Sequence, residues 1–290
     1  MVQPHTNSGE RTDESMGLAI DSTLQLNDGA YMPRLGLGVY QIATGSHCRL
    51  AVTRALELGY RHIDTAAIYS NESDVGRAVR EAAVPREQIF VTTKLWNSDQ
   101  GYDSAINAGA HSLRQLGLEW IDLYLIHWPE PRKRLDSWRA LIELRKRGVA
   151  RSIGVSNYTV SHLKELMAAS DVVPAVNQVE FNPFLYQREL LKFCSVHGIA
   201  LVAYCPLARA HKLDDERLQA TAKRHGKTSA QIMIRWALQK GVGVIPKSEH
   251  PQRIAENADV FDFLLDADDL RVVDALNEDL RTSWDPSQVR

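Results

Sequence analysis

Short apolar runs alternate along the chain with longer segments in which apolar residues recur at helical spacing. Short runs that are apolar throughout are typical of strands buried on both faces of a parallel sheet. We predict eight such strands, at Arg34–Val39, His62–Ala66, Ile89–Lys94, Ile121–His127, Ser152–Ser156, Ala175–Glu180, Ala200–Tyr204 and Gly243–Pro246.

The segments between these strands have the pattern of amphipathic helices, and clear examples are Cys48–Leu58, Ser104–Leu116, Trp138–Lys146 and Glu189–His197. A glycine follows each of them within two residues, at a position that favours the end of a helix. Strands that alternate with helices eight times within 290 residues predict one α/β domain, a (β/α)8 TIM barrel.

A doubly wound sheet is the structural alternative to the barrel. Its dinucleotide-binding form requires a GxGxxG turn directly after a strand. No predicted strand has this turn, because Gly36-Leu-Gly38 lacks both the third glycine and a helix immediately after it. The sequence therefore argues against a Rossmann domain.

Two segments precede the first barrel strand. Alternating apolar positions around Asn27-Asp28-Gly29 predict a β-hairpin that plugs one end of the barrel. Residues 1–20 are polar, lack the apolar core of a secretory signal, and are predicted to form a mobile tail. We therefore divide the chain into this tail and a single barrel domain over residues 21–290.

Charge and cysteine content narrow the range of partners. Lys and Arg total 34 against 36 Asp and Glu, so the chain lacks the positive field that nucleic acids or anionic membranes require. The apolar runs are too short to span a bilayer. Cys48, Cys194 and Cys205 lie far apart and show no metal-binding spacing. We expect a cytoplasmic monomer that holds no metal and acts on a small molecule.

Polar side chains gather where the predicted strands end, at the edge of the barrel that carries active sites. Asp64, Lys94 and His127 end the second, third and fourth strands, and Tyr69 follows Asp64 closely. A phenol is a poor proton donor near neutral pH unless it is perturbed. Lys94 beside Tyr69 would lower the pKa of the phenol, Asp64 would pair with Lys94, and His127 would polarise a carbonyl oxygen.

Each of these residues also has a purely structural interpretation. Asp64 and Lys94 could be an ordinary buried ion pair, Tyr69 an aromatic at the core edge, and His127 a satisfied strand histidine. A lysine at the end of a buried strand is costly without a purpose, however, and here an acid and a phenol accompany it at neighbouring strand ends. The combination favours a catalytic site.

Six motifs in order along the chain carry a family resemblance: Gly36-Leu-Gly38, Asp64-Thr-Ala-Ala-Ile-Tyr69, Thr93-Lys94-Leu-Trp96, Asp122-Leu-Tyr-Leu-Ile-His127-Trp-Pro129, Gly154-Val-Ser-Asn157 and Ile245-Pro-Lys-Ser248. From about Thr23 to the C-terminus the chain resembles the aldo-keto reductase family, and in particular its microbial 2,5-diketogluconate reductase and prostaglandin F synthase-like members. This resemblance implies an NADPH-dependent oxidoreductase that interconverts carbonyls and alcohols, with a catalytic tetrad of Asp64, Tyr69, Lys94 and His127.

The resemblance also implies a cofactor site across the barrel mouth, formed by Gly38, Val39, Ser156, Asn157, Gln178, Tyr204, Cys205, Leu207, Lys247, Ser248, Arg253, Glu256 and Asn257. Lys247 and Arg253 would meet an adenosine 2′-phosphate, since a point charge and a planar donor fork both suit that group. Glu256 would face the adenine amino group. We therefore expect NADPH rather than NADH.

The substrate pocket is expected to have aromatic walls from Tyr40, Trp96, Trp128 and Trp284 beside His127. Trp284 could instead only pack its loop against the barrel. Short connections at Glu130–Asp136 and Ala208–Lys212 resemble those of the microbial members and imply an open pocket of broad specificity.

Two other functions remain open at this point. A glycoside hydrolase on the same barrel needs two facing carboxylates, and Asp64 and Glu180 are available. The fourth strand ends in His and the seventh in Tyr-Cys, however, which leaves no obvious acid pair. A redox-sensing subunit that binds NADPH and regulates a partner would keep the cofactor site without catalysing turnover. An assay of NADPH oxidation with an aromatic aldehyde distinguishes these functions.

Overall fold

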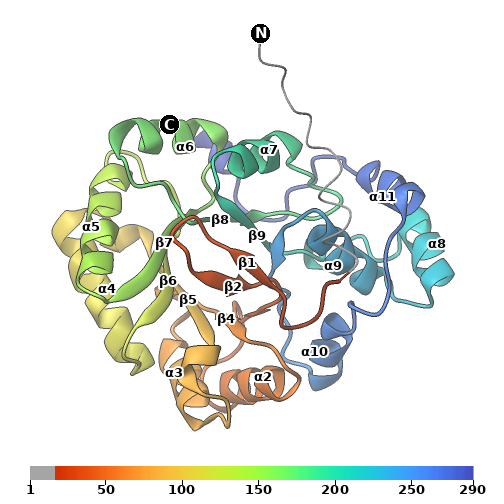
Figure 1. Ribbon diagram of the computed structural model, residues 1–290, viewed down its shortest axis with the longest axis horizontal. Coiled ribbons are helices and arrows are strands. Elements are labelled where there is room, and N and C mark those ends of the chain that lie inside the picture. Colours follow the sequence, from red (N-terminus) through yellow and green to blue (C-terminus); the bar gives the residue numbers. More distant parts are fainter. Residues whose placement is uncertain (1–16, 290) are drawn as a thin grey trace.

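Eight parallel strands form a closed barrel in the computed structural model, which describes residues 17–289 (Figure 1). The sheet order runs without interruption from β3 to β10, and each neighbouring pair is parallel. The strands are β3 (Leu37–Gly38), β4 (His62–Asp64), β5 (Phe90–Leu95), β6 (Ile121–Ile126), β7 (Ala150–Ser156), β8 (Val176–Glu180), β9 (Ala200–Tyr204) and β10 (Gly243–Val244). The predicted (β/α)8 barrel is confirmed. The tail predicted for residues 1–20 lies, up to residue 16, outside the described residues.

The barrel closes where its first and last strands meet, a place we call the seam. Two isolated parallel bridges join it, Leu35 with Val244 and Gly38 with Lys247. Both strands at the seam are shorter than the sequence predicted, with two residues each. Pro246 contributes to this shortening, because proline has no backbone N–H to donate to a ladder. The strands β4 to β9 match their predicted positions to within a few residues.

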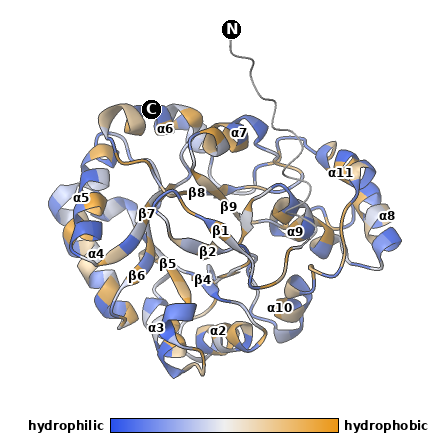
Figure 2. Cartoon of the chain, in the orientation of Figure 1, coloured by the Kyte–Doolittle hydropathy of each residue, from blue (hydrophilic) through white to orange (hydrophobic). Residues whose placement is uncertain are grey.

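Helices surround the barrel, and each carries hydrophilic and hydrophobic stretches side by side, as expected for amphipathic helices (Figure 2). They are α2 (Ser46–Glu57), α3 (Glu72–Glu81), α4 (Tyr102–Leu116), α5 (Arg134–Lys146), α6 (Val160–Ala169), α7 (Arg188–Val196), α8 (Glu216–His225), α9 (Ser229–Gln239), α10 (Pro251–Ala258) and α11 (Ala267–Asp274). Their apolar faces pack on the outside of the strands in one continuous core. No helix among residues 17–289 is long and apolar enough to cross a membrane.

The N-terminal hairpin closes one end of the barrel. Strands β1 (Thr23–Gln25) and β2 (Tyr31–Pro33) are antiparallel, and in Figure 1 they cross the centre of the ring. Leu26 and Met32 are buried against Leu123, Leu125 and other residues that fill the barrel interior. The hairpin covers this end, and the main cavity lies at the other end, where the strands terminate.

Helices α3 and α4 approach so closely that a glycine is required between them. A Cβ atom added to Gly76 would lie 1.7 Å from the carbonyl oxygen of Leu116 and 2.5 Å from its carbonyl carbon. Backbone atoms cannot move aside as a flexible side chain can. Gly76→Ala is therefore expected to lower the free energy of unfolding by about 3 kcal/mol or more, and the melting temperature by on the order of 10 °C.

Thermal unfolding followed by circular dichroism measures this effect. The matched control is Gly17→Ala, because no heavy atom lies within 4 Å of a Cβ placed there. Equal melting temperatures for the two variants would mean that the α3–α4 contact is looser than the structure indicates.

Candidate functional site

A cavity of about 800 Å³ opens at the end of the barrel opposite the hairpin. Its walls come from the loops that follow the strands, together with Ser283 and Trp284 of the C-terminal segment. In parallel barrels these loops are carried at fixed positions by a rigid scaffold, which suits them to hold reacting groups in place.

A buried ion pair lies at the base of this cavity. Lys94, on β5, donates from Nζ to Oδ1 of Asp64 at 2.5 Å and to the carbonyl oxygen of Thr65 at 2.8 Å. The lysine side chain is wholly buried, and Asp64 ends the neighbouring strand β4. Burial lowers the pKa of Lys94, and the charge of Asp64 opposes that change. Parallel pairing of β4 with β5 brings these two side chains together.

Tyr69 ends a short 3-10 helix (Ala67–Tyr69) that follows β4. The centroid of its ring lies 5.2 Å from Nζ of Lys94 and 5.8 Å from the centroid of the His127 ring. Its pKa is raised well above the ordinary value, first by burial and then by the charge of Asp64. The net shift is therefore upward, opposite to the net lowering expected from Lys94, and the Tyr69 hydroxyl keeps its proton near neutral pH.

His127 directly follows β6 and completes the group. Burial, followed by the charge of Lys94, lowers its pKa well below the ordinary value, so the imidazole is neutral. A neutral imidazole has one nitrogen that donates and one that accepts. Its Nδ1 is buried and has no hydrogen-bond partner within residues 17–289.

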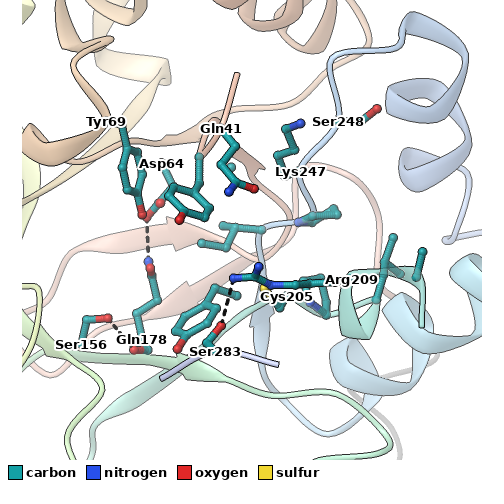
Figure 3. Close-up of a pocket in the computed structure, with 18 of the residues that line it drawn as sticks. Gln41, Asp64, Tyr69, Ser156, Gln178, Cys205, Arg209, Lys247, Ser248 and Ser283 are labelled. Atoms are coloured by element: carbon teal, nitrogen blue, oxygen red, sulfur yellow. Dashed lines mark hydrogen bonds between the residues drawn. The ribbon is translucent and has the colours of Figure 1, made fainter. Parts of the chain in front are cut away.

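Amide side chains from the next strands connect to the same acid. Gln178, on β8, donates from Nε2 to Oδ2 of Asp64 at 2.6 Å, as the dashed line in Figure 3 shows. Asn157, after β7, donates from Nδ2 to the carbonyl oxygen of His127 at 3.0 Å and accepts from the hydroxyl of Tyr204 at 2.7 Å. Both amides are buried, and together they present polar groups beside the Lys94–Asp64 pair.

Two cations lie near the outer end of the cavity. Lys247 and Arg253 are exposed, line the cavity, and form no ion pair within the described part of the chain. Lys247 follows β10, and Arg253 lies in the first turn of α10, where the helix dipole also favours negative charge. Glu256, one turn further along, accepts a hydrogen bond from the Thr228 hydroxyl at 2.7 Å. This end of the cavity is suited to an anionic group.

Aromatic rings form the opposite wall. The ring centroids of Trp284 and Trp128 lie 4.7 Å apart, those of Tyr40 and Tyr69 lie 4.9 Å apart, and those of Trp96 and His127 lie 5.2 Å apart. Trp284 is 53% exposed although it lines the cavity. Trp284 therefore contributes to the wall as well as packing against another loop.

The loop after β9 has an unusual backbone conformation. Ala208, Arg209 and Ala210 are consecutive residues with φ of 46°, 51° and 66°, and Cys205 has φ of 46°. Side chains with a Cβ rarely adopt this left-handed region, and each such residue costs of order 1 kcal/mol. Strain of this kind is found most often at binding sites, and this loop borders the cavity.

The structure brings nearly all residues singled out in the sequence to one cavity. Its walls include Gly38, Tyr40, Asp64, Tyr69, Trp96, His127, Trp128, Ser156, Asn157, Gln178, Tyr204, Cys205, Leu207, Lys247, Ser248, Arg253, Glu256, Asn257 and Trp284. Lys94 lies behind Asp64, and Val39 does not reach the cavity. Val39 is buried in the core, where its N–H donates to the carbonyl oxygen of Asp64 at 3.0 Å.

Sequence reasoning missed Gln41, Arg209 and Ser283, which also line the cavity. The guanidinium of Arg209 donates to Oγ of Ser283 at 3.4 Å (Figure 3). Arg209 could have been found, because it is a cation in a loop that follows a barrel strand. No local feature of the sequence marks Ser283. Within residues 17–289 no group of three or more His, Cys, Asp or Glu side chains could hold a metal ion.

Known proteins similar to this chain include several that are named as reductases. The profile of the Aldo/keto reductase family matches residues 34–278. The chain is 47% identical over 274 residues to glyoxal reductase from Bacillus subtilis (strain 168), covering 94% of this chain and 99% of that protein. It is 45% identical over 275 residues to methylglyoxal reductase DkgA from Escherichia coli (strain K12), covering 93% and 99%. A solved variant of Gox0644 in complex with NADPH has a TM-score of 0.87 and 44% identity, covering 92% of this chain and 98% of that one.

Proposed function

Because the chain belongs to the aldo/keto reductase family, we propose that its preferred substrates are small α-dicarbonyl compounds such as glyoxal and methylglyoxal. NADPH-dependent carbonyl reduction is the reaction of this enzyme. Two relatives of nearly equal length are named as reductases of these two compounds. The buried Lys94–Asp64 pair beside Tyr69 and His127 at the base of the cavity supports carbonyl reduction, and the names of these relatives support the α-dicarbonyl preference.

The residues around the cavity fit the cofactor. Ser156, Asn157 and Gln178 offer buried amide and hydroxyl groups for the nicotinamide carboxamide, and Tyr204 offers a ring face beside them. Residues along the outer cavity would hold the rest: Gly38, Cys205 and Leu207 beside the pyrophosphate, Lys247, Ser248 and Arg253 at the 2′-phosphate, and Glu256 and Asn257 at the adenine. When bound, NADPH supplies the hydride that reduces the carbonyl carbon.

The chain's own residues would then handle the proton and the carbonyl oxygen. Tyr69 would donate its hydroxyl proton to that oxygen, and its raised pKa keeps the proton in place until the oxygen becomes basic. The neutral ring of His127 would donate a hydrogen bond to the same oxygen and orient it. Lys94 would stabilise the phenolate left on Tyr69, while Asp64 holds the ammonium in place.

A substrate panel tests the proposed preference. Initial rates of NADPH oxidation would be compared for glyoxal, methylglyoxal, an aromatic aldehyde, a simple ketone and a keto-sugar. We expect the highest kcat/KM for the two α-dicarbonyls. A higher value for the keto-sugar would overturn the preference. NADPH binding without turnover of any carbonyl would favour a sensor subunit instead.

Arg253→Ala is expected to weaken NADPH binding and to leave NADH binding nearly unchanged. The arginine would make a charge-assisted hydrogen bond to the 2′-phosphate, which NADH lacks. Loss of such a bond costs about 1.5–3 kcal/mol, or about 10- to 150-fold in Kd. Fluorescence titration of both cofactors measures the change.

The control for this variant is Arg77→Ala, since Arg77 is exposed on α3, pairs with Glu81 and lies away from the cavity. The control should bind both cofactors as the unaltered enzyme does. An equal loss of NADH and NADPH affinity in Arg253→Ala would indicate a disturbed fold and not a phosphate contact.

We also propose that the enzyme acts as a monomer in the cytoplasm. All three cysteines are free thiols, and Cys48 and Cys194 are buried, which suits a reducing compartment. One chain supplies both the cofactor-binding and the substrate-binding residues of the cavity. Sedimentation equilibrium should give the mass of a single chain, and a dimer mass would contradict the proposed monomer.

A further inference from the structure

Glu180 is a buried carboxylate with an unusual set of partners. It ends β8 and is completely buried. Its Oε1 accepts hydrogen bonds from the backbone N–H of Thr282 at 2.8 Å and from the Thr282 hydroxyl, and its Oε2 accepts from the N–H of Ser283 at 3.0 Å. No cation among residues 17–289 forms an ion pair with this carboxylate.

An ionised carboxylate is costly to bury, and without a cation its hydrogen bonds must offset that cost. Charge-assisted bonds of this type are stronger than neutral ones. Here every donor to the side chain comes from two consecutive residues near the C-terminus, more than one hundred positions away in the sequence. The arrangement therefore ties the end of a barrel strand to the C-terminal segment.

We define residues 281–285 as the C-terminal strap. Upstream of the strap, the N–H of Leu280 donates to the carbonyl oxygen of Phe184 at 2.9 Å. Within the strap, the backbone N–H groups of Thr282 and Ser283 form hydrogen bonds to another part of the described chain. Both donate to Glu180. Arg281 and Asp285 pair with each other across it. Glu180 is thus the anchor at the middle of the strap.

The strap carries two groups that meet the cavity. Ser283 accepts a hydrogen bond from Arg209 in the strained loop after β9, and Trp284 packs against Trp128 with 4.7 Å between ring centroids. Figure 3 shows Ser283 and Arg209 joined beside Cys205. Glu180 itself does not line the cavity. The hydrogen bonds of its carboxylate therefore reach the cavity through the strap.

We propose that Glu180 is a positioning residue that holds the strap across the cavity mouth and so sets the affinity for bulky aromatic carbonyl substrates through Trp284. This inference rests on the proposed function, because it assumes that carbonyl compounds bind in the cavity against Trp128 and Trp284. A small dicarbonyl that reaches Tyr69 and His127 has little surface left to contact Trp284. Its affinity should depend much less on the strap.

Glu180→Gln tests the proposal with little change in volume. Both carboxylate oxygens accept hydrogen bonds, so the amide nitrogen of the glutamine must face an N–H donor and release part of the strap. We expect KM for phenylglyoxal to rise about ten-fold and KM for methylglyoxal less than about three-fold, with kcat for both changed less than about two-fold. The matched control is Glu189→Gln, which makes the same change at an exposed position on α7.

A double-mutant cycle shows whether Glu180 acts through Trp284. Trp284→Ala alone should also raise KM for phenylglyoxal, and adding Glu180→Gln to it should change that value by less than about two-fold. If the rise in KM in the double variant equalled the product of the rises in the two single variants, Glu180 would not act through Trp284. Should Glu180→Gln fail to fold by circular dichroism, Thr282→Val replaces it in the cycle, because it removes one donor and keeps the carboxylate.

Proteolysis provides a readout that does not depend on turnover. Trypsin cleavage after Arg281, followed by mass spectrometry without cofactor or substrate, should be about ten-fold faster in Glu180→Gln than in Glu189→Gln. Equal cleavage rates, or an equal rise in KM for both dicarbonyls, would overturn the inference. Faster cleavage in an enzyme that reduces no carbonyl would support the anchor and contradict the proposed function.

Discussion

Replacing Tyr69 by Phe is expected to lower kcat/KM for carbonyl reduction by about 10²- to 10⁴-fold. The substitution removes the proton that we propose the phenol gives to the carbonyl oxygen. It keeps the ring, so the contacts with Tyr40 and His127 that position this part of the wall are retained. Cofactor affinity should stay within about two-fold of the unaltered enzyme, because Tyr69 is not among the residues assigned to the cofactor. Loss of a direct contact would weaken binding by more than this.

Steady-state NADPH oxidation with methylglyoxal measures the first quantity, and fluorescence titration of NADPH measures the second. Tyr40→Phe is the control, because Tyr40 is a second tyrosine that lines the same cavity and is not assigned the proton. If Tyr69→Phe and Tyr40→Phe reduced turnover equally, Tyr69 would not be the proton donor.

Lys94→Met is expected to damage both catalysis and stability. Catalysis should fall by about 10²-fold or more, since Tyr69 loses the charge that would stabilise its phenolate. Asp64 would remain buried without a cation, with Gln178 as its remaining side-chain donor. Removing one partner of a buried pair costs about 3–5 kcal/mol, which lowers the melting temperature by on the order of 10 °C.

Adding Asp64→Asn to the Lys94→Met variant separates the effect on catalysis from the effect on stability. The double variant has no uncompensated buried charge, so part of the lost melting temperature should return, while turnover should stay low. Differential scanning fluorimetry and rate measurements on the two variants are sufficient. Recovery of turnover together with stability would mean that Lys94 acts only as a structural residue.

Much of the barrel could be predicted because its strands are short runs rich in apolar residues that alternate with segments of helical spacing. The strands β4 to β9 were found in this way, whereas β3 and β10 were predicted too long. Their pattern is the same, but the ladder at the seam consists of isolated bridges and not of consecutive residue pairs. Pairing depends on the whole barrel, and no local pattern records it.

The base of the site could be predicted for the same geometric reason. Parallel strands end at one edge, so polar residues at neighbouring strand ends must meet, as Asp64 and Lys94 do. Val39 shows the limit of this reasoning. It directly follows Gly38, yet neighbouring residues of an extended chain point in opposite directions, and its side chain enters the core.

Two features needed the folded structure. The direction of the Tyr69 pKa depends on how deeply the ring is buried and on where Asp64 lies relative to Lys94, and neither appears in the sequence. Glu180 was considered in the sequence only as an acid for a hydrolase. Its actual partners, Thr282 and Ser283, are too distant along the chain for any local pattern to connect them.

The seam also links cofactor affinity to the rigidity of the whole barrel. Gly38 and Lys247 bridge β3 and β10 where pairing is sparse, and both line the cavity. A ligand held by both residues would fasten the junction at which the barrel closes, so amide hydrogen exchange there should slow when the ligand is bound. Ligand at 100 times its Kd adds about 2.7 kcal/mol to the free energy of unfolding. The cellular supply of NADPH would therefore influence the lifetime of the folded enzyme as well as its rate.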